Sequence, residues 1–201
     1  DADYLRYDNL QDQDFQNTTY NATGTTSLLQ NITANLPTTV NIYAVKSDYI
    51  HPLGHKAELS AGVKASFVNT DNSANYFNVN NGATTVDLNN TNHFIYHENI
   101  QAAYVSFNKE LKRFAFQGGL RAEHTDVNGH QLGNSRSTDS TVVQNYLDVF
   151  PTAYLSYKLD SAGNHQLIAS YGRRINRPYY QDLNPFVFIL DKYSTFQGNP
   201  F

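Results

Sequence analysis

The chain has 201 residues, a formal net charge of −4 and no Cys, Met or Trp. The absence of Cys excludes a disulfide framework and a thiolate metal site, and the acidic balance argues against nucleic acid as a partner. Charged residues make up only 16% of the chain while aromatic residues make up 13%, a mixture unlike a helical enzyme and typical of a β-protein with long polar loops.

The first 38 residues are polar, with Asp8, Asp12 and Asp14 ahead of an Asn/Thr-rich stretch. A calcium-binding loop would need ligands at alternate positions, a Gly turn and a closing Glu, and none of these is present. We therefore expect residues 1–38 to form a polar, loop-like segment. No Met occurs anywhere, so we also expect the sequence to be a piece of a longer chain.

Two-residue alternation begins near residue 39 and is clearest over residues 55–68. There Leu59, Val63 and Phe67 point to one side of a strand, while Glu58 and Lys64 point to the other. On the strand over 112–126, Phe116 and Leu120 should share that apolar side, and Arg121 and Glu123 the wet one.

Six strands are expected in all. They are residues 39–50, 55–68, 93–107, 112–126, 142–158 and 164–175. Their connections alternate between short and long, as in outer-membrane barrels with short periplasmic turns and long outer loops. Pro151 lacks a ladder donor and indicates an edge, a bulge or a bend in the fifth strand. The predicted fold class is all-β, an antiparallel meander with very little helix.

No run of about 18 apolar residues occurs, so no transmembrane helix is expected. A membrane is not thereby excluded, because a barrel strand shows only about ten alternating residues.

Residues 171–186 read Tyr-Gly-Arg-Arg-Ile-Asn-Arg-Pro-Tyr-Tyr-Gln-Asp-Leu-Asn-Pro-Phe, and residues 198–200 read Gly-Asn-Pro. This ordered string resembles the signature of Bacteroidetes-type outer-membrane β-barrel proteins, the TonB-dependent receptor family that includes the SusC-like importers. Gly172 stands where that family usually has Ser. The signature positions are Arg173, Arg174, Asn176, Arg177, Pro178, Tyr180, Gln181, Asp182, Leu183, Asn184, Pro185, Phe186, Gly198, Asn199 and Pro200.

Further stretches resemble the family in the same order, so that the resemblance covers about residues 39–201. These stretches lie near residues 42–52, 62–64, 93–104, 118–123 and 146–151.

The resemblance implies a segment of a transmembrane β-barrel of about 22 strands in the bacterial outer membrane, in contact with its lipid. It also implies energised import of a nutrient, such as a glycan or siderophore, through a TonB contact made by a plug region outside this sequence. A surface lipoprotein is a further implied partner. The chain itself would supply wall and outer loops, with ligand contacts near residues 69–92, 127–141 and 176–199.

No residue is expected to be catalytic, and no cofactor or metal is expected. His93 and His97 share a strand face about 13 Å apart, which is too far for one zinc ion. The cluster of Arg173, Arg174 and Arg177 is expected where a strand leaves the membrane, paired with loop carboxylates such as Asp182.

An alternative is a soluble β-sandwich module that binds carbohydrate at a cell surface. In that case the apolar strand faces would be buried in a protein core, and the isolated protein would not need detergent. The small residues Ala57, Ala61, Ala65, Gly118 and Ala122 on the apolar faces favour this alternative, whereas the loop lengths and the signature favour the barrel.

Overall fold

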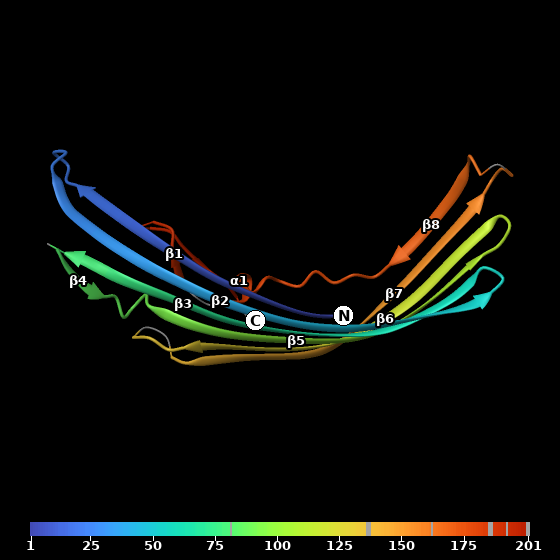
Figure 1. Cartoon of the computed structure of the whole chain (residues 1–201). Coiled ribbons are helices and arrows are strands. Elements are labelled where there is room, and N and C mark those ends of the chain that lie inside the picture. Colours follow the sequence, from blue (N-terminus) through green and yellow to red (C-terminus); the bar gives the residue numbers. More distant parts are fainter. Residues whose placement is uncertain (81, 136–137, 162, 185–186, 192, 200–201) are drawn as a thin grey trace.

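The computed structural model is one strongly curved antiparallel sheet, with a short C-terminal stretch on its concave side (Figure 1). It describes residues 1–80, 82–135, 138–161, 163–184, 187–191 and 193–199. Eight strands form the large sheet and two short strands form a separate pair. Within these ranges no helix has both the length and the apolar character needed to cross a membrane.

The elements in chain order are β1 (Ala2–Tyr20), β2 (Thr26–Gly54), β3 (Ala57–Asn80), β4 (Ala83–Val86), β5 (Asn92–Glu110), β6 (Phe114–Leu132), β7 (Ser140–Lys158), β8 (Gln166–Gly172), α1 (Tyr180–Leu183), β9 (Val187–Ile189) and β10 (Thr195–Gln197). The large sheet has the order β1-β2-β3-β5-β6-β7-β8, and β4 pairs with the end of β3. This order confirms the predicted antiparallel meander.

The expectation of a loop over residues 1–38 is wrong, because most of these residues form β1 and the first part of β2, and only a short turn over 21–25 separates the two strands. The two strands pair along the whole of β1, so that Phe15 opposes Ile32. Backbone groups supply the bonds of a sheet, and a strand between neighbours can therefore be polar on much of its surface. Asn35 Nδ2, for example, donates to Asp12 Oδ1 across the pair at 2.7 Å.

Three predicted strand ends are also corrected. β3 continues past residue 68 to Asn80 and β6 continues past residue 126 to Leu132, so much of the two expected long loops is strand. β8 ends at Gly172 rather than at residue 175.

Pro151 explains the early end of β8. The Pro151 carbonyl accepts a hydrogen bond from Arg173 N at 3.1 Å, so this residue turns its backbone groups toward β8. The N–H that proline lacks would have faced the same neighbour. The ladder between β7 and β8 stops at the pair Thr152–Gly172, which makes Pro151 a local edge, as its residue type indicates.

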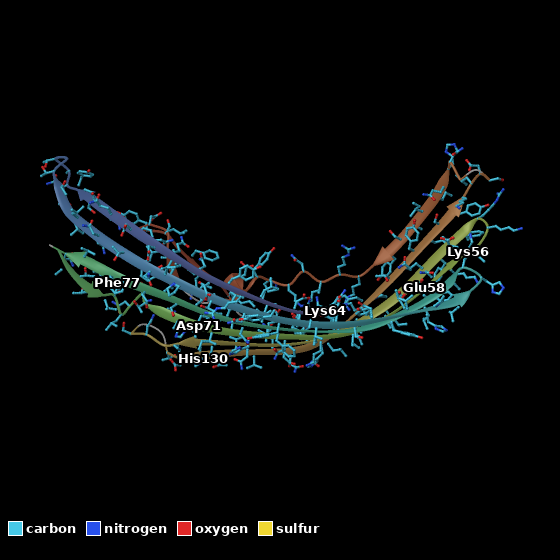
Figure 2. All side chains as sticks on the ribbon, in the orientation of Figure 1. Lys56, Glu58, Lys64, Asp71, Phe77 and His130 are labelled. Atoms are coloured by element: carbon cyan, nitrogen blue, oxygen red, sulfur yellow. The ribbon has the colours of Figure 1, made fainter. Side chains whose placement is uncertain are left out.

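The register confirms which side chains share a face, because directly opposed residues lie on the same side of a sheet. Val63 falls on the same side as Leu120, and Lys64 falls on the other side with Glu123. Figure 2 shows Lys64 on the concave side and His130 on the convex side. The convex set comprises Leu59, Val63, Phe67, Phe116 and Leu120, and the concave set comprises Glu58, Lys64, Arg121 and Glu123.

The convex face carries a band of apolar side chains, most of whose large members are exposed while its alanines on β3 are half-buried or buried. Val63, at its middle, is 56% exposed. On β3 the band runs from Ala57 to Phe67, about 34 Å along a strand at ~3.4 Å per residue. One edge holds the stacked rings of Tyr4 and Tyr43, with centroids 4.9 Å apart. The opposite edge holds the tilted pair Phe114 and Tyr157 at 4.6 Å. On strands tilted by ~45°, this length matches the ~25 Å lipid-facing band of outer-membrane barrels with its aromatic girdles.

The concave face holds a buried apolar cluster, beyond the level of this band. Its members are Ile32, Ala34, Leu36, Ala74, Tyr76, Phe94, Tyr96 and Val127. Leu183, Phe188 and Ile189 pack against it, so the described residues of 173–199, here called the C-terminal segment, fold back over the inside of the sheet (Figure 1). Burial raises the pKa of the Tyr76 phenol, and the nearby Ile189 backbone opposes part of this rise.

Candidate functional site on the concave face

A row of side chains crosses the concave face at mid-height of the convex band. Asp48, Gly62, Tyr104, Arg121 and Phe150 oppose one another in turn on β2, β3, β5, β6 and β7. Alternation along each strand places all five on the same side. The chain therefore brings an acid, two rings and a base into one line perpendicular to the strands.

Tyr104 lies flat across Gly62 and reaches the next strand, where its hydroxyl donates to Asp48 Oδ1. A Cβ atom added to Gly62 would lie 2.5 Å from Tyr104 ring atoms. Only glycine therefore leaves room for this ring. The Arg121 guanidinium lies over the same ring, 5.3 Å from its centroid, in a cation–π contact.

Glu123 holds two guanidinium groups together. Its Oε1 accepts from Arg121 Nε at 2.5 Å and its Oε2 from Arg177 Nη2 at 2.5 Å. Arg177 also donates to Thr125 Oγ1 at 3.2 Å. Glu123 and Thr125 are buried, so this carboxylate is largely removed from water and its charge is balanced by side chains. Arg177 belongs to the C-terminal segment, and the contact ties that segment to β6.

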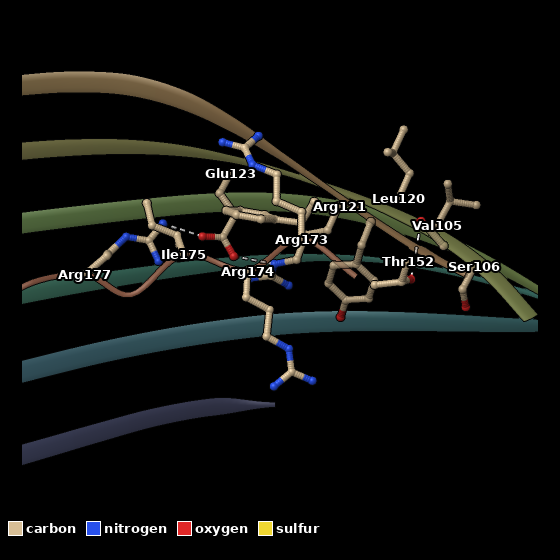
Figure 3. Close-up of a pocket in the computed structure, with 13 residues that line it drawn as sticks. Val105, Ser106, Leu120, Arg121, Glu123, Thr152, Arg173, Arg174, Ile175 and Arg177 are labelled. Carbon is tan, nitrogen blue, oxygen red and sulfur yellow. Dashed lines mark hydrogen bonds and ion pairs between the residues drawn. The ribbon is translucent and has the colours of Figure 1, made fainter. Parts of the chain in front are cut away.

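Arg173 is fixed in a similar way at β7. It donates to Asp148 Oδ1 at 2.7 Å and to the Val149 carbonyl at 2.8 Å, and it lies 5.6 Å from the centroid of the Phe150 ring. Arg174 differs from it. Among the described residues no carboxylate pairs with Arg174, and Figure 3 shows its side chain extending away from Glu123.

These side chains surround an open groove with a volume of about 470 Å³ on the concave face (Figure 3). Tyr104, Ser106 and Thr152 line it beside the arginines. A Cβ atom at Gly119 would lie 2.8 Å from Thr152 Oγ1, so this glycine also keeps space open. The groove combines fixed positive charge with hydrogen-bonding groups, which suits binding rather than bond-breaking chemistry.

The signature residues beyond Arg177 stabilise the C-terminal segment itself. Asp182 Oδ2 accepts from Tyr179 N at 3.1 Å and so caps the start of α1. Gly198 N donates to the Asn184 carbonyl at 3.0 Å and Asn199 N to the Asp182 carbonyl at 2.7 Å. The two separated parts of the signature thus meet and close a loop.

The remaining signature positions fall in four groups. Asn176 and Pro178 are exposed, and Leu183 packs on the concave cluster. Tyr180 and Gln181 lie in α1, but their side chains are outside the described part of the structure. Pro185, Phe186 and Pro200 are themselves outside the described residues.

The expectation that the arginine cluster pairs with Asp182 is wrong. Asp182 caps α1, whereas Arg173 and Arg177 pair with Asp148 and Glu123 on the sheet. Sequence reasoning placed Glu123 on the wet face but gave it no partner. The sequence carries no local signal for this pair, because Glu123 and Arg177 are 54 positions apart. They meet only because Glu123 lies on the concave face and the C-terminal segment folds back over that face.

His93 and His97 share one face of β5, as the alternation predicts, and that face is the convex one. His93 Nε2 lies 2.6 Å from Asp71 Oδ1, and His97 Nδ1 lies 2.6 Å from Asn69 Oδ1. Each ring therefore has its own partner on β3. In the described part of the chain no group of three or more His, Cys, Asp or Glu side chains is arranged to hold a metal ion.

Comparison with known proteins shows one family match. The model of the outer membrane protein beta-barrel family matches residues 1–201, which is the whole chain. A search of curated proteins finds no match. The family match includes β1 and the first part of β2, which the resemblance in sequence motifs did not reach.

Proposed function

Because the chain belongs to the outer membrane protein beta-barrel family and resides in the bacterial outer membrane, we propose that it forms wall and inner-loop structure of a TonB-dependent receptor that imports a nutrient. Members of this family are generally transport or structural proteins rather than enzymes. The convex band faces the lipid, and the concave face lines the interior of the barrel. A soluble sandwich would instead bury the apolar face of one sheet against a second sheet.

One observation carries the proposal. The signature string begins where β8 leaves the sheet, and the chain then turns to the inside and docks on β6 through Arg177 and Glu123. An import path needs an interior wall with loops that narrow it and offer polar contacts, and the C-terminal segment is of this kind. The match of this string to the signature of TonB-dependent receptors supports the more specific assignment.

The proposal includes parts beyond this chain. Among the described residues β1 and β8 do not pair with each other, so the sheet has two open edges, and further strands of a larger barrel would satisfy their backbone groups. A plug domain would contact TonB, and a surface lipoprotein would deliver the ligand. The imported ligand would be a glycan, a siderophore or a compound of similar size.

The test is genetic. A strain lacking the gene and a strain lacking TonB should be grown on a panel of single glycans and of ferric siderophores. Both strains should lose growth on the same nutrient, and a plasmid copy of the gene should restore it only where TonB is present. A nutrient whose uptake needs this protein but not TonB would contradict the proposal, and so would normal growth of the deletion strain on every member of the panel.

A further inference from the structure

We propose that the concave groove binds a hydroxylated anion, namely an oligosaccharide that carries carboxylate or phosphate groups. This inference rests on the proposed role in import and names the class of compound that the interior wall would recognise. It starts from the charge of the groove. Four guanidinium groups line it, those of Arg121, Arg173, Arg174 and Arg177. Two carboxylates, Glu123 and Asp148, pair with three of them, which leaves an excess of two positive charges.

The positive groups are held in place before any ligand arrives. Arg121 is fixed between the Tyr104 ring and Glu123, and Arg173 between the Phe150 ring and Asp148. Side chains already ordered lose little further conformational freedom on binding, so a ligand keeps more of its interaction energy. Guanidinium groups also match the planar, paired oxygens of carboxylate and phosphate.

Arg174 is the side chain free to take the anion. It lines the groove, is exposed, and among the described residues forms no ion pair. Its neighbours Arg173 and Arg177 use their charge to hold the fold. Ser106 and Thr152 line the same groove, and their hydroxyl groups can exchange hydrogen bonds with sugar hydroxyls. A volume of about 470 Å³ is within the usual range of sites for small ligands.

The position of the groove along the strands supports a role in the passage of the ligand through the barrel. The row that contains Tyr104 and Arg121 lies level with the middle of the convex band. A cationic site at that level meets a solute inside the barrel rather than at the cell surface. Charges that line a path raise the local concentration of ligands of opposite sign and lower that of like-charged ones.

The experiment uses the full-length protein purified from the outer membrane in detergent. Isothermal titration calorimetry would compare trigalacturonate and maltotriose phosphate with neutral maltotriose. We expect at least one of the two anionic sugars to bind about tenfold or more tighter than maltotriose, with an affinity that falls as salt rises because screening weakens the charge contacts. Preference for trigalacturonate would assign carboxylate, and preference for maltotriose phosphate would assign phosphate.

Arg174→Gln should lower the affinity for the anionic sugar by about tenfold or more, and Arg174→Lys should recover part of that loss. The affinity for maltotriose should be the same in both variants as in the original protein. The matched control is Arg113→Gln, which removes an arginine whose side chain contacts Ser161 in a turn region, away from the groove. Equal affinity for all three sugars would overturn the inference, as would an equal loss in the Arg174 and Arg113 variants. If anionic sugars bind as expected but no nutrient uptake depends on TonB, the proposed function fails while the anion site stands. If uptake of a nutrient depends on TonB but the anionic sugars bind no tighter than maltotriose, the anion site alone is contradicted.

Discussion

Replacing Val63 by Arg tests the orientation of the whole sheet in the membrane. Val63 is 56% exposed on the convex face, and it lies midway along the apolar band that runs on β3 from Ala57 to Phe67. An Arg on the lipid side of a barrel strand costs about 2–4 kcal/mol at the bilayer midplane and ~0–1 kcal/mol near the interfaces. We therefore expect Val63→Arg to lower the free energy of unfolding by an amount within the range for the bilayer midplane.

The matched control is Ser60→Arg, on the same strand but on the concave face. Its charge would point into the watery interior, so its cost should be close to zero. The assay is urea-induced unfolding of each full-length variant refolded into lipid vesicles, followed by the loss of resistance to protease. Because a one-residue slip of register exchanges the two faces, the opposite ranking, with Ser60→Arg the damaging change, would refute this orientation.

Three further outcomes are expected in the same unfolding assay. Arg177→Met leaves the buried Glu123 with one partner fewer and should cost about 1–3 kcal/mol, with faster hydrogen exchange at Leu183 and Ile189 as the sign that the C-terminal segment has loosened. Gly62→Ala should destabilise by ~1–3 kcal/mol when Tyr104 is present but have little effect in a Tyr104→Ala background, since the clash is with that ring; equal costs in both backgrounds would contradict the packing. Tyr76→Ala removes a side chain that is 1% exposed and should cost about 3–5 kcal/mol, whereas Tyr193→Ala, at 87% exposed, should stay within ~0.5 kcal/mol.

The sequence predicts those strands whose two faces differ. Over residues 55–68 one side is apolar and the other polar, and that contrast defines both the strand and its orientation. β1 offers no such contrast, because Asn, Asp, Gln and Thr occupy both of its sides over long stretches. It is a strand because β2 satisfies its backbone groups, and a pairing partner cannot be read from local composition.

The site, like the strands, could be predicted in part from local sequence, and the rest depends on contacts between distant segments. Arg121 and Glu123 could be assigned to the wet face from alternation, and Arg173 and Arg177 could be recognised as part of an ordered signature. The contact between Glu123 and Arg177 could not be predicted, since it depends on the chain leaving β8 at Gly172 and turning inward. The space for Tyr104 over Gly62 likewise depends on register across two strands, which no single strand encodes.

A change of phase along the strands explains why the predicted strands ended too early. On β3 the apolar side chains of the band, such as Val63 and Phe67, point to the convex side, but farther along Ala74 and Tyr76 point to the concave side. β5 changes in the same way between Val105 in the band and Phe94 in the cluster.

The predicted strand ends at residues 68 and 126 fall where the apolar side chains switch from one face of the sheet to the other. The two-residue alternation is interrupted there, although the backbone continues as a strand. The change has a physical cause. Within a membrane the outside of a barrel must be apolar and the inside wet, whereas above a membrane the outside meets water and the inside can be covered by a docked segment. We therefore propose that the level at which the apolar side chains change face marks the outer surface of the bilayer. On this proposal the concave cluster with its docked segment stands above that surface, and the groove with Arg174 lies below it.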